Sequence, residues 1–200
     1  LDRASVRDLE TVLYVTMGRF TDAVRVGCEG LRLLGERSLD NPDRAAAFAE
    51  ERAKIDKLLS ARHAESMVDV VMLEDPNQRA ILRTLIHLVP AAYATDPALL
   101  FLVAARMVRT TLEGGPTEDS AFAFAEYGMT LAAMQRYDEA FHMGEIALRL
   151  FERFPSVRFA CICYVCVGGN LHFYRRPLAA CLPYLERAQR EGLATGDFPF

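Results

Sequence analysis

Three cysteines, Cys161, Cys163 and Cys166, lie close together and are followed by His172. Thiolates and imidazole are ligands that zinc prefers, so the cluster is the constellation most suggestive of a metal site. A helix advances about 100° per residue, which turns Cys163 about 200° and Cys166 about 140° from Cys161. One helix cannot aim all three thiolates at one ion. We therefore expect core packing, with metal or redox chemistry as the alternative.

Phosphate chemistry has little support in the sequence. A phosphate-binding P-loop places a lysine after glycines, but Lys54 follows Ala53 and Lys57 follows Asp56. The pair Gly114-Gly115 is explained by a helix end, with an anion-binding loop as the alternative. The histidines fall on different predicted helices, so sequence does not assemble a nucleophile and base: His63, His87, His142 and His172. We expect no catalytic, cofactor-binding or metal-binding residues.

The charged side chains are predicted to be solvated or to form ion pairs with nearby residues. The carboxylate pairs Glu50-Glu51 and Asp138-Glu139 fall on polar helix faces or in first turns, where solvation and the helix dipole explain them. Six arginines could recognise an anion, but ion pairs with nearby acids are the simpler explanation for most of them: Arg106, Arg109, Arg149, Arg153, Arg175 and Arg176.

Composition bounds the class of protein. The chain has 200 residues, of which 52% are hydrophobic and 25% charged, and its net charge is −4. Without a basic footprint we expect no nucleic-acid partner. The apolar runs are shorter than the ~20 residues that a membrane-spanning helix requires. The five cysteines are not spaced like a secreted disulfide framework, so a cytoplasmic location is expected.

The secondary-structure elements are predicted to be helices, because apolar residues rarely alternate with polar ones. Gly and Pro residues separate segments of helical length. The chain begins at Leu1 and ends after a turn signal at Gly196-Asp197, so we expect a piece of a longer protein. The breaks predict helices at 2–17, 20–35, 43–60, 64–71, 77–92, 97–113, 117–134, 137–153, 156–174 and 177–192.

A repeat of about 40 residues runs through these helices. Gly128 and Gly168 are 40 apart, as are Ala140 and Ala180. The predicted fold is therefore all-α, a right-handed solenoid of antiparallel helical hairpins forming one domain over 1–200. Its approximate units are 1–41, 42–75, 76–115, 116–155 and 156–200.

Two stretches resemble the turn between the helices of a tetratricopeptide repeat: Met17-Gly-Arg-Phe-Thr-Asp-Ala23 and Met134-Gln-Arg-Tyr-Asp-Glu-Ala140. A longer resemblance, over roughly 60–197, is to the helical segment that follows the P-loop ATPase module of large multidomain signalling proteins. It rests on Leu88 to Leu100, Arg106 to Arg109, Glu126 to Gly128, Arg175 to Leu178 and Glu191 to Asp197. It implies a context of serine/threonine kinase, GAF and histidine-kinase modules, and no catalysis in this segment.

The expected function is a non-catalytic scaffold that holds a protein segment, or a neighbouring domain of the same chain, in a groove. By the tetratricopeptide resemblance, the groove-facing candidates are Phe122, Ala125, Met129, Val165, His172 and Phe173. Core packing is the competing interpretation for each of them. The alternative functions are a small-molecule sensor that closes on its ligand to regulate attached catalytic modules, and an enzyme that uses the cysteine cluster.

Overall fold

The computed structural model describes residues 3–61 and 71–196. These residues form helices and connecting segments and contain no strand, which confirms the all-α prediction. The helix predicted at 64–71 lies outside the described residues except for Val71, which is not helical. No helix in the described ranges combines the length and apolar character needed to cross a membrane.

The chain forms two compact units. Among the described residues, the first unit ends at Gly115 and the second begins at Pro116. The prediction of one repeat domain over 1–200 stays a prediction, and each unit is treated by itself below.

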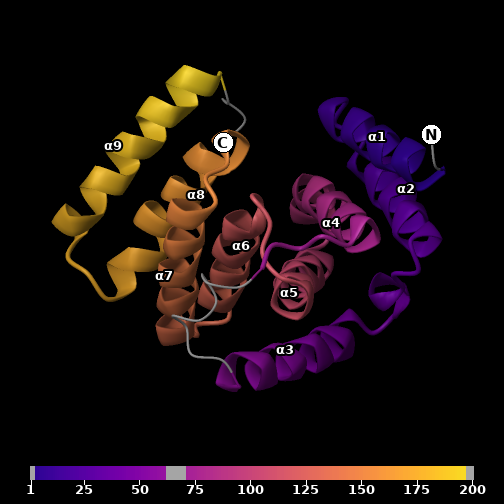
Figure 1. Cartoon of the computed structure of the whole chain (residues 1–200), viewed down its shortest axis with the longest axis horizontal. Helices are drawn as coiled ribbons and strands as arrows, with labels where there is room; N and C mark the ends of the chain where they lie inside the picture. The colour runs from indigo at the N-terminus through magenta and orange to yellow at the C-terminus, as the bar shows by residue number, and fades with distance from the viewer. Residues whose placement is uncertain (1–2, 62–70, 197–200) are drawn as a thin grey trace. The chain divides into compact units, whose positions relative to one another are not determined.

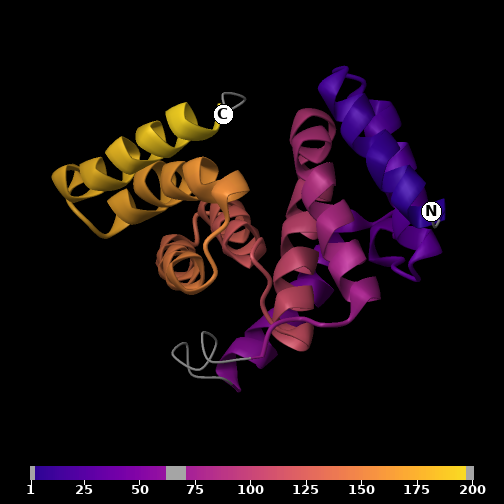
Figure 2. The ribbon, with the colours of Figure 1, turned by 45° about the horizontal axis from the view of Figure 1, so that its top comes forward.

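The first unit pairs helices that are neighbours in sequence. The helix α1 (Arg3–Thr16) packs against α2 (Phe20–Leu33), and both contact α4 (Pro76–Thr95). The next helix, α5 (Pro97–Gly114), packs against α4 and also against α3 (Arg44–Ser60). Figures 1 and 2 show α1 lying alongside α2, and α4 alongside α5.

Aspartates start α4 and α5 where the sequence predicted breaks. The Asp96 carboxylate accepts a hydrogen bond from the Ala98 amide at 2.9 Å, and Pro97 follows it as the first helical residue. Asp75 does the same for α4 ahead of Pro76. An aspartate cap followed by proline fits a helix start, because the free amides need acceptors and proline lacks an amide.

The second unit begins with a helical hairpin and continues through an irregular helix. The helices α6 (Ser120–Ala133) and α7 (Tyr137–Arg153) pack together, and α9 (Leu178–Thr195) packs on α8 (Ala160–Val165). Between α8 and α9 lie the π-helical turn η4 (Cys166–Leu171) and the 3-10 turn η5 (His172–Tyr174), and the short turn η3 (Val157–Phe159) precedes α8. The helix predicted over 156–174 is therefore present as consecutive helical turns of different types, of which only Ala160–Val165 is α-helical.

The π-helical turn shifts the repeat register by one residue. A Cβ on Gly128 would lie 3.3 Å from the Ala140 carbonyl oxygen, and one on Gly168 would lie 3.3 Å from that of Cys181. Ala140 thus corresponds to Cys181, which is buried, and not to Ala180, which is exposed. A π-helical turn holds an additional residue, which explains why the 40-residue spacing fails after Gly168.

Two turns of the chain have the same geometry. Gly18 and Gln135 both adopt a positive φ, of 68° and 60°. The Arg19 amide donates to the Tyr14 carbonyl at 2.8 Å, and the Arg136 amide donates to the Leu131 carbonyl at 2.9 Å. The two stretches singled out in the sequence therefore form equivalent turns.

Candidate interaction surfaces

Three of the predicted groove residues lie in the core of the second unit. Phe122 is buried and stacks on Phe159 with ring centroids 4.8 Å apart. Ala125 and His172 have no exposed surface. These side chains pack helices together and present no surface in this structure.

The other three candidates retain accessible surface. Met129 and Val165 are half-buried, and Phe173 is exposed. The Phe173 ring packs on Tyr174 at 4.3 Å, and Tyr174 stacks on Tyr137 at the same distance. Phe173 thus belongs to a short ladder of aromatic rings at the start of α7.

His172 links α7 to the segment before α9. Its Nε2 lies 2.9 Å from a Glu145 carboxylate oxygen, which also accepts a hydrogen bond from Arg176 at 3.0 Å. Phe141 and Tyr184 pack against the imidazole. Burial lowers the pKa of His172, although the Glu145 charge opposes that shift. The group is a structural contact between helices.

The cysteine cluster is packed in the core. Cys161, Cys163 and Cys166 are free thiols and all are buried, which confirms the predicted packing. Burial raises the pKa of Cys163 and of Cys166, so their reactive thiolate forms are disfavoured. Within residues 3–61 and 71–196, no group of three or more His, Cys, Asp or Glu side chains is placed to hold a metal ion.

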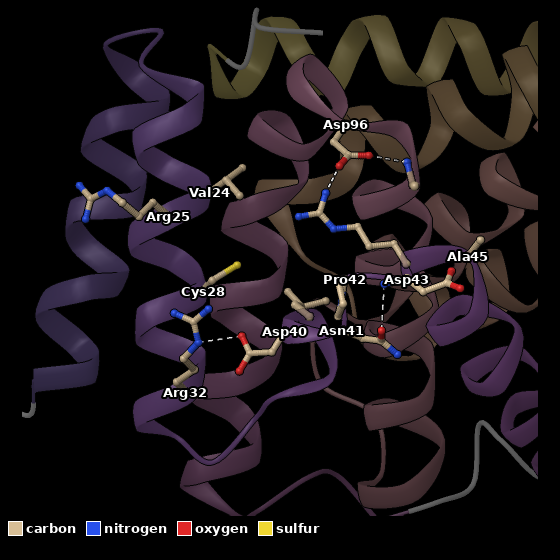
Figure 3. Close-up of a pocket in the computed structure, with 13 residues that line it drawn as sticks. Val24, Arg25, Cys28, Arg32, Asp40, Asn41, Pro42, Asp43, Ala45 and Asp96 are labelled. Atoms are coloured by element: carbon tan, nitrogen blue, oxygen red, sulfur yellow. Dashed lines mark hydrogen bonds and ion pairs between the residues drawn. The ribbon is translucent and has the colours of Figure 1, made fainter.

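An open groove of about 970 Å³ lies in the first unit between α2, the segment before α3, and the start of α5. Figure 3 shows Arg32 directed at Asp40, and their Nε and Oδ1 atoms are 2.7 Å apart. Arg44 forms an ion pair with Asp96, the cap of α5. Because these charges neutralise each other in pairs, the groove offers no excess charge for a small ion.

Cys28 and Asp43 also line this groove. Burial raises the pKa of the half-buried Cys28 thiol. The Asp43 carboxylate accepts a hydrogen bond from the Ala46 amide at 3.0 Å and so caps α3. The groove is therefore lined by helix caps, paired charges and apolar side chains such as Val24 and Leu39, without an evident reactive group.

Buried ion pairs connect α5 to the segment that follows α2 and to α3. Arg106 lies 2.5 Å from Glu36, and Arg109 lies 2.5 Å from Glu51, which also contacts Lys54 at 3.1 Å. The prediction of a surface position for Glu51 is wrong, because its carboxylate is buried against Arg109. Burial opposes ionisation of Glu36, but the hydrogen bonds and charge of Arg106 leave its pKa below the ordinary value.

Sequence reasoning also missed Asp8, which is buried in α1. Its carboxylate lies 2.8 Å from Arg83 and 2.8 Å from His87, both on α4. The available signal was the spacing, since Asp8 shares one helix face with Ala4 and Thr11 and both of these are buried. Its partners are far away in sequence, so the pairing itself had no local signal.

Two helices expose apolar side chains along one face. The α1 outer face consists of Val6, Leu9 and Leu13 on the helix together with Met17 in the turn after it, with exposed fractions of 42% to 62%. The α9 leucine face consists of Leu178, Leu182, Leu185 and Leu193, with exposed fractions of 37% to 73%. Single exposed apolar residues are ordinary, but contiguous apolar faces are typical of interaction surfaces.

Comparisons with known proteins give a distant signalling relative. Over 123 residues, 58% of this chain, the sequence is 27% identical to the hybrid signal transduction histidine kinase G of Dictyostelium discoideum. The matched stretch is only 4% of that protein's length. No family model matches the chain. No solved structure matches it either. The similarity agrees with the expected signalling context.

Proposed function

We propose that this chain is a non-catalytic helical scaffold that makes protein–protein or inter-domain contacts within a cytoplasmic, multidomain signalling protein. Its own residues supply surfaces, and attached kinase or P-loop ATPase modules supply the chemistry. The partner is a protein segment or a neighbouring domain of the same polypeptide.

The α9 leucine face is the observation that carries this proposal. At 100° per residue, its four leucines fall within an arc of about 80° on the helix. They lie beside the face of α9 that packs into the second unit through Cys181, Ala188 and Gly192. A leucine-rich strip, interrupted by the exposed Gln189, lies next to a packed face and is suited to receive a further helix.

The equivalent turns at Gly18 and Gln135 support a tetratricopeptide-like array, in which hairpins bind along an extended surface. The relative in Dictyostelium supports the signalling context. A sensor that closes around a ligand calls for an enclosed apolar cavity, whereas the groove in the first unit is open and its apolar lining is mixed with paired charges. The scaffold is therefore the function that these observations favour.

Thiol labelling tests the scaffold. A Leu182→Cys variant is compared in the isolated chain and in the multidomain polypeptide, with Arg190→Cys, at an exposed polar position, as the matched control. The background is low because four native cysteines are buried and Cys28 is half-buried. We expect labelling at position 182 to slow at least tenfold in the longer polypeptide while position 190 is unchanged. Equal rates at position 182 would contradict the proposal.

A further inference from the structure

The helices α7 and α9 are equivalent second helices of their hairpins, and their residues can be matched one by one. The register set by Ala140 and Cys181 places each α9 residue 41 positions after its counterpart on α7. Three residues of the α9 leucine face thereby have counterparts on α7: Leu178 matches Tyr137, Leu182 matches Phe141, and Leu185 matches Gly144. The contacts of α7 therefore indicate what this face of α9 can bind.

The residues that follow α8 cover the corresponding face of α7. Tyr137 stacks on Tyr174, with ring centroids 4.3 Å apart. One turn further along α7, Phe141 packs on His172 with centroids 5.2 Å apart. Leu178 and Leu182, at the matching positions of α9, are exposed by 73% and 55%. The apolar positions are thus repeated on α9, and their cover is found on α7 alone.

The same face carries an acid on both helices. On α7, Glu145 lies 2.9 Å from His172 and accepts a hydrogen bond from Arg176 at 3.0 Å. Its counterpart on α9 is Glu186, which is exposed, and no side chain among the described residues forms an ion pair with it. An unpaired acid at the edge of an apolar strip selects a partner that brings a cation to that point.

One position differs between the helices and specifies the shape of the partner. A Cβ on Gly144 of α7 would lie 3.2 Å from Leu171, and in the first unit Leu88 of α4 occupies the space beside the equivalent Gly27 of α2. In both cases a later leucine fits against a glycine. The α9 helix has Leu185 here, which projects outward and is 37% exposed. Close packing on α9 therefore requires a small residue opposite Leu185.

We propose that the α9 leucine face binds a further helical segment of the same polypeptide, seated on α9 as the residues after α8 are seated on α7. The segment brings apolar side chains to Leu178 and Leu182, glycine or alanine to Leu185, and arginine or histidine to Glu186. The helices α2 and α7 are both covered by later parts of their own chain, which favours such a segment over a second copy. This inference rests on the proposed scaffold function and names the partner of its α9 face.

Thiol labelling of the multidomain polypeptide tests the inference through Glu186. In the Leu182→Cys background we expect Glu186→Gln to raise the labelling rate at position 182 about threefold, because the ion pair at the edge of the contact is lost. The matched control Glu191→Gln removes the same charge about 180° around α9 from position 182 and leaves the rate unchanged. In the isolated chain neither substitution changes the rate. Circular dichroism checks that each variant is folded.

Salt provides a second readout of the cation. Raising the salt concentration should weaken the protection of position 182 in the Leu182→Cys polypeptide, because it screens the pair between Glu186 and its partner. The polypeptide that also carries Glu186→Gln should respond less. An equal response in both would show that the partner brings no cation to Glu186 and would overturn the inference.

Other results would also overturn the inference. One is protection at position 182 that Glu186→Gln leaves unchanged, or that Glu191→Gln weakens equally, and this result leaves the scaffold function intact. Another is protection that appears in the isolated chain as its concentration rises, since a second copy would then be the occupant. A multidomain polypeptide without any protection at position 182 contradicts the scaffold function and this inference together, so the two failures are distinguishable.

Discussion

The hairpins α1–α2 and α6–α7 share one turn but have different interiors. Both turns contain a residue with positive φ, the same backbone hydrogen bonds, and an exposed arginine that pairs with an acid three residues later. Where α1 buries Asp8 and Thr11, α6 buries Ala125 and Gly128 at the same distance from the turn. The geometry of the turn is thus determined by local residues, whereas the polarity of the buried helix face depends on which side chains of the same unit pack against it.

The two hairpins also differ in the pKa of an acidic residue on their first helix, Asp8 on α1 and Glu126 on α6. Burial alone would raise the pKa of Asp8, but the hydrogen bond and charge of His87 and the charge of Arg83 outweigh it, and the pKa is lowered. On α6, burial raises the pKa of Glu126 to about 7. The same residue class therefore stabilises the fold on one hairpin and destabilises it on the other at neutral pH.

The largest expected effect comes from placing a large side chain in the close helix contact that follows each of the two turns. Ala23 and Ala140 occupy equivalent positions after the two turns and have no exposed surface. Substituting either with Phe leaves no room for the ring, so we expect a loss of about 3 kcal/mol in unfolding free energy. Ala180→Phe, at an exposed position, serves as the control and should change stability by less than about 0.5 kcal/mol. Equal destabilisation at 140 and 180 in chemical denaturation would restore the 40-residue register.

Replacing Glu126, the acid on α6 whose pKa is raised by burial, should stabilise the chain at alkaline pH. A raised pKa means that the folded state holds the proton more tightly, so stability is lost as pH rises from about 4 through about 7. Glu126→Gln removes the cost of ionisation and should add about 2 kcal/mol at pH 8. Denaturation at pH 4 and pH 8 checks this, and a variant with no gain at pH 8 would show that the carboxylate is well solvated.

The paired acid on α1 should behave in the opposite way. A lowered pKa contributes stability above the unfolded pKa of about 3.9, and this stability is lost as pH falls through the folded pKa. We expect Asp8→Asn to cost about 1.5 kcal/mol at pH 7, a value reduced because Arg83 is half-exposed. The difference between wild type and variant should shrink below about pH 4. A difference that stays constant down to pH 3 would assign the loss to packing.

Exchanging the residues with positive φ tests whether the two turns are equivalent. Nothing lies within 4 Å of a Cβ built on Gly18, so only backbone strain opposes a side chain there. Gly18→Gln should destabilise the first hairpin by about 1 kcal/mol, and Gln135→Gly should stabilise the second by about 0.5 kcal/mol. Thermal melting of each single variant measures this. Changes of the same sign at both positions would mean that the turns differ.

Much of the fold could be predicted because its determinants are local. Asp75-Pro76 and Asp96-Pro97 start α4 and α5 where the sequence indicated, and the buried cysteines followed from helix geometry. The change from α-helical to π-helical turns within 156–174 could not be predicted in this way, because it keeps the helical direction and needs no proline. Gly168 and Gly169 lie in that π-helical turn.

Less of the candidate site could be predicted. Phe122, Ala125 and His172 recur at helical spacing as groove residues would, and periodicity does not distinguish a packed face from an open one. Glu51 and Asp8 were missed or misplaced because their partners, Arg109 and Arg83, are distant in sequence. The exposure of the α1 outer face could not be predicted either. The buried side of α1 holds Asp8, whose partners Arg83 and His87 are distant in sequence.

Turnover of ATP by the purified chain, with magnesium present and contaminant controls included, most directly separates a scaffold from an enzyme. Phosphoryl transfer requires phosphate-binding amides or a lysine, acidic metal ligands and a positioned base or water. Lys54 is held by Glu51, and we expect no turnover above the buffer control. Turnover that survives repurification and disappears in a folded Lys54→Ala variant would contradict the scaffold and indicate a nucleotide site in this chain.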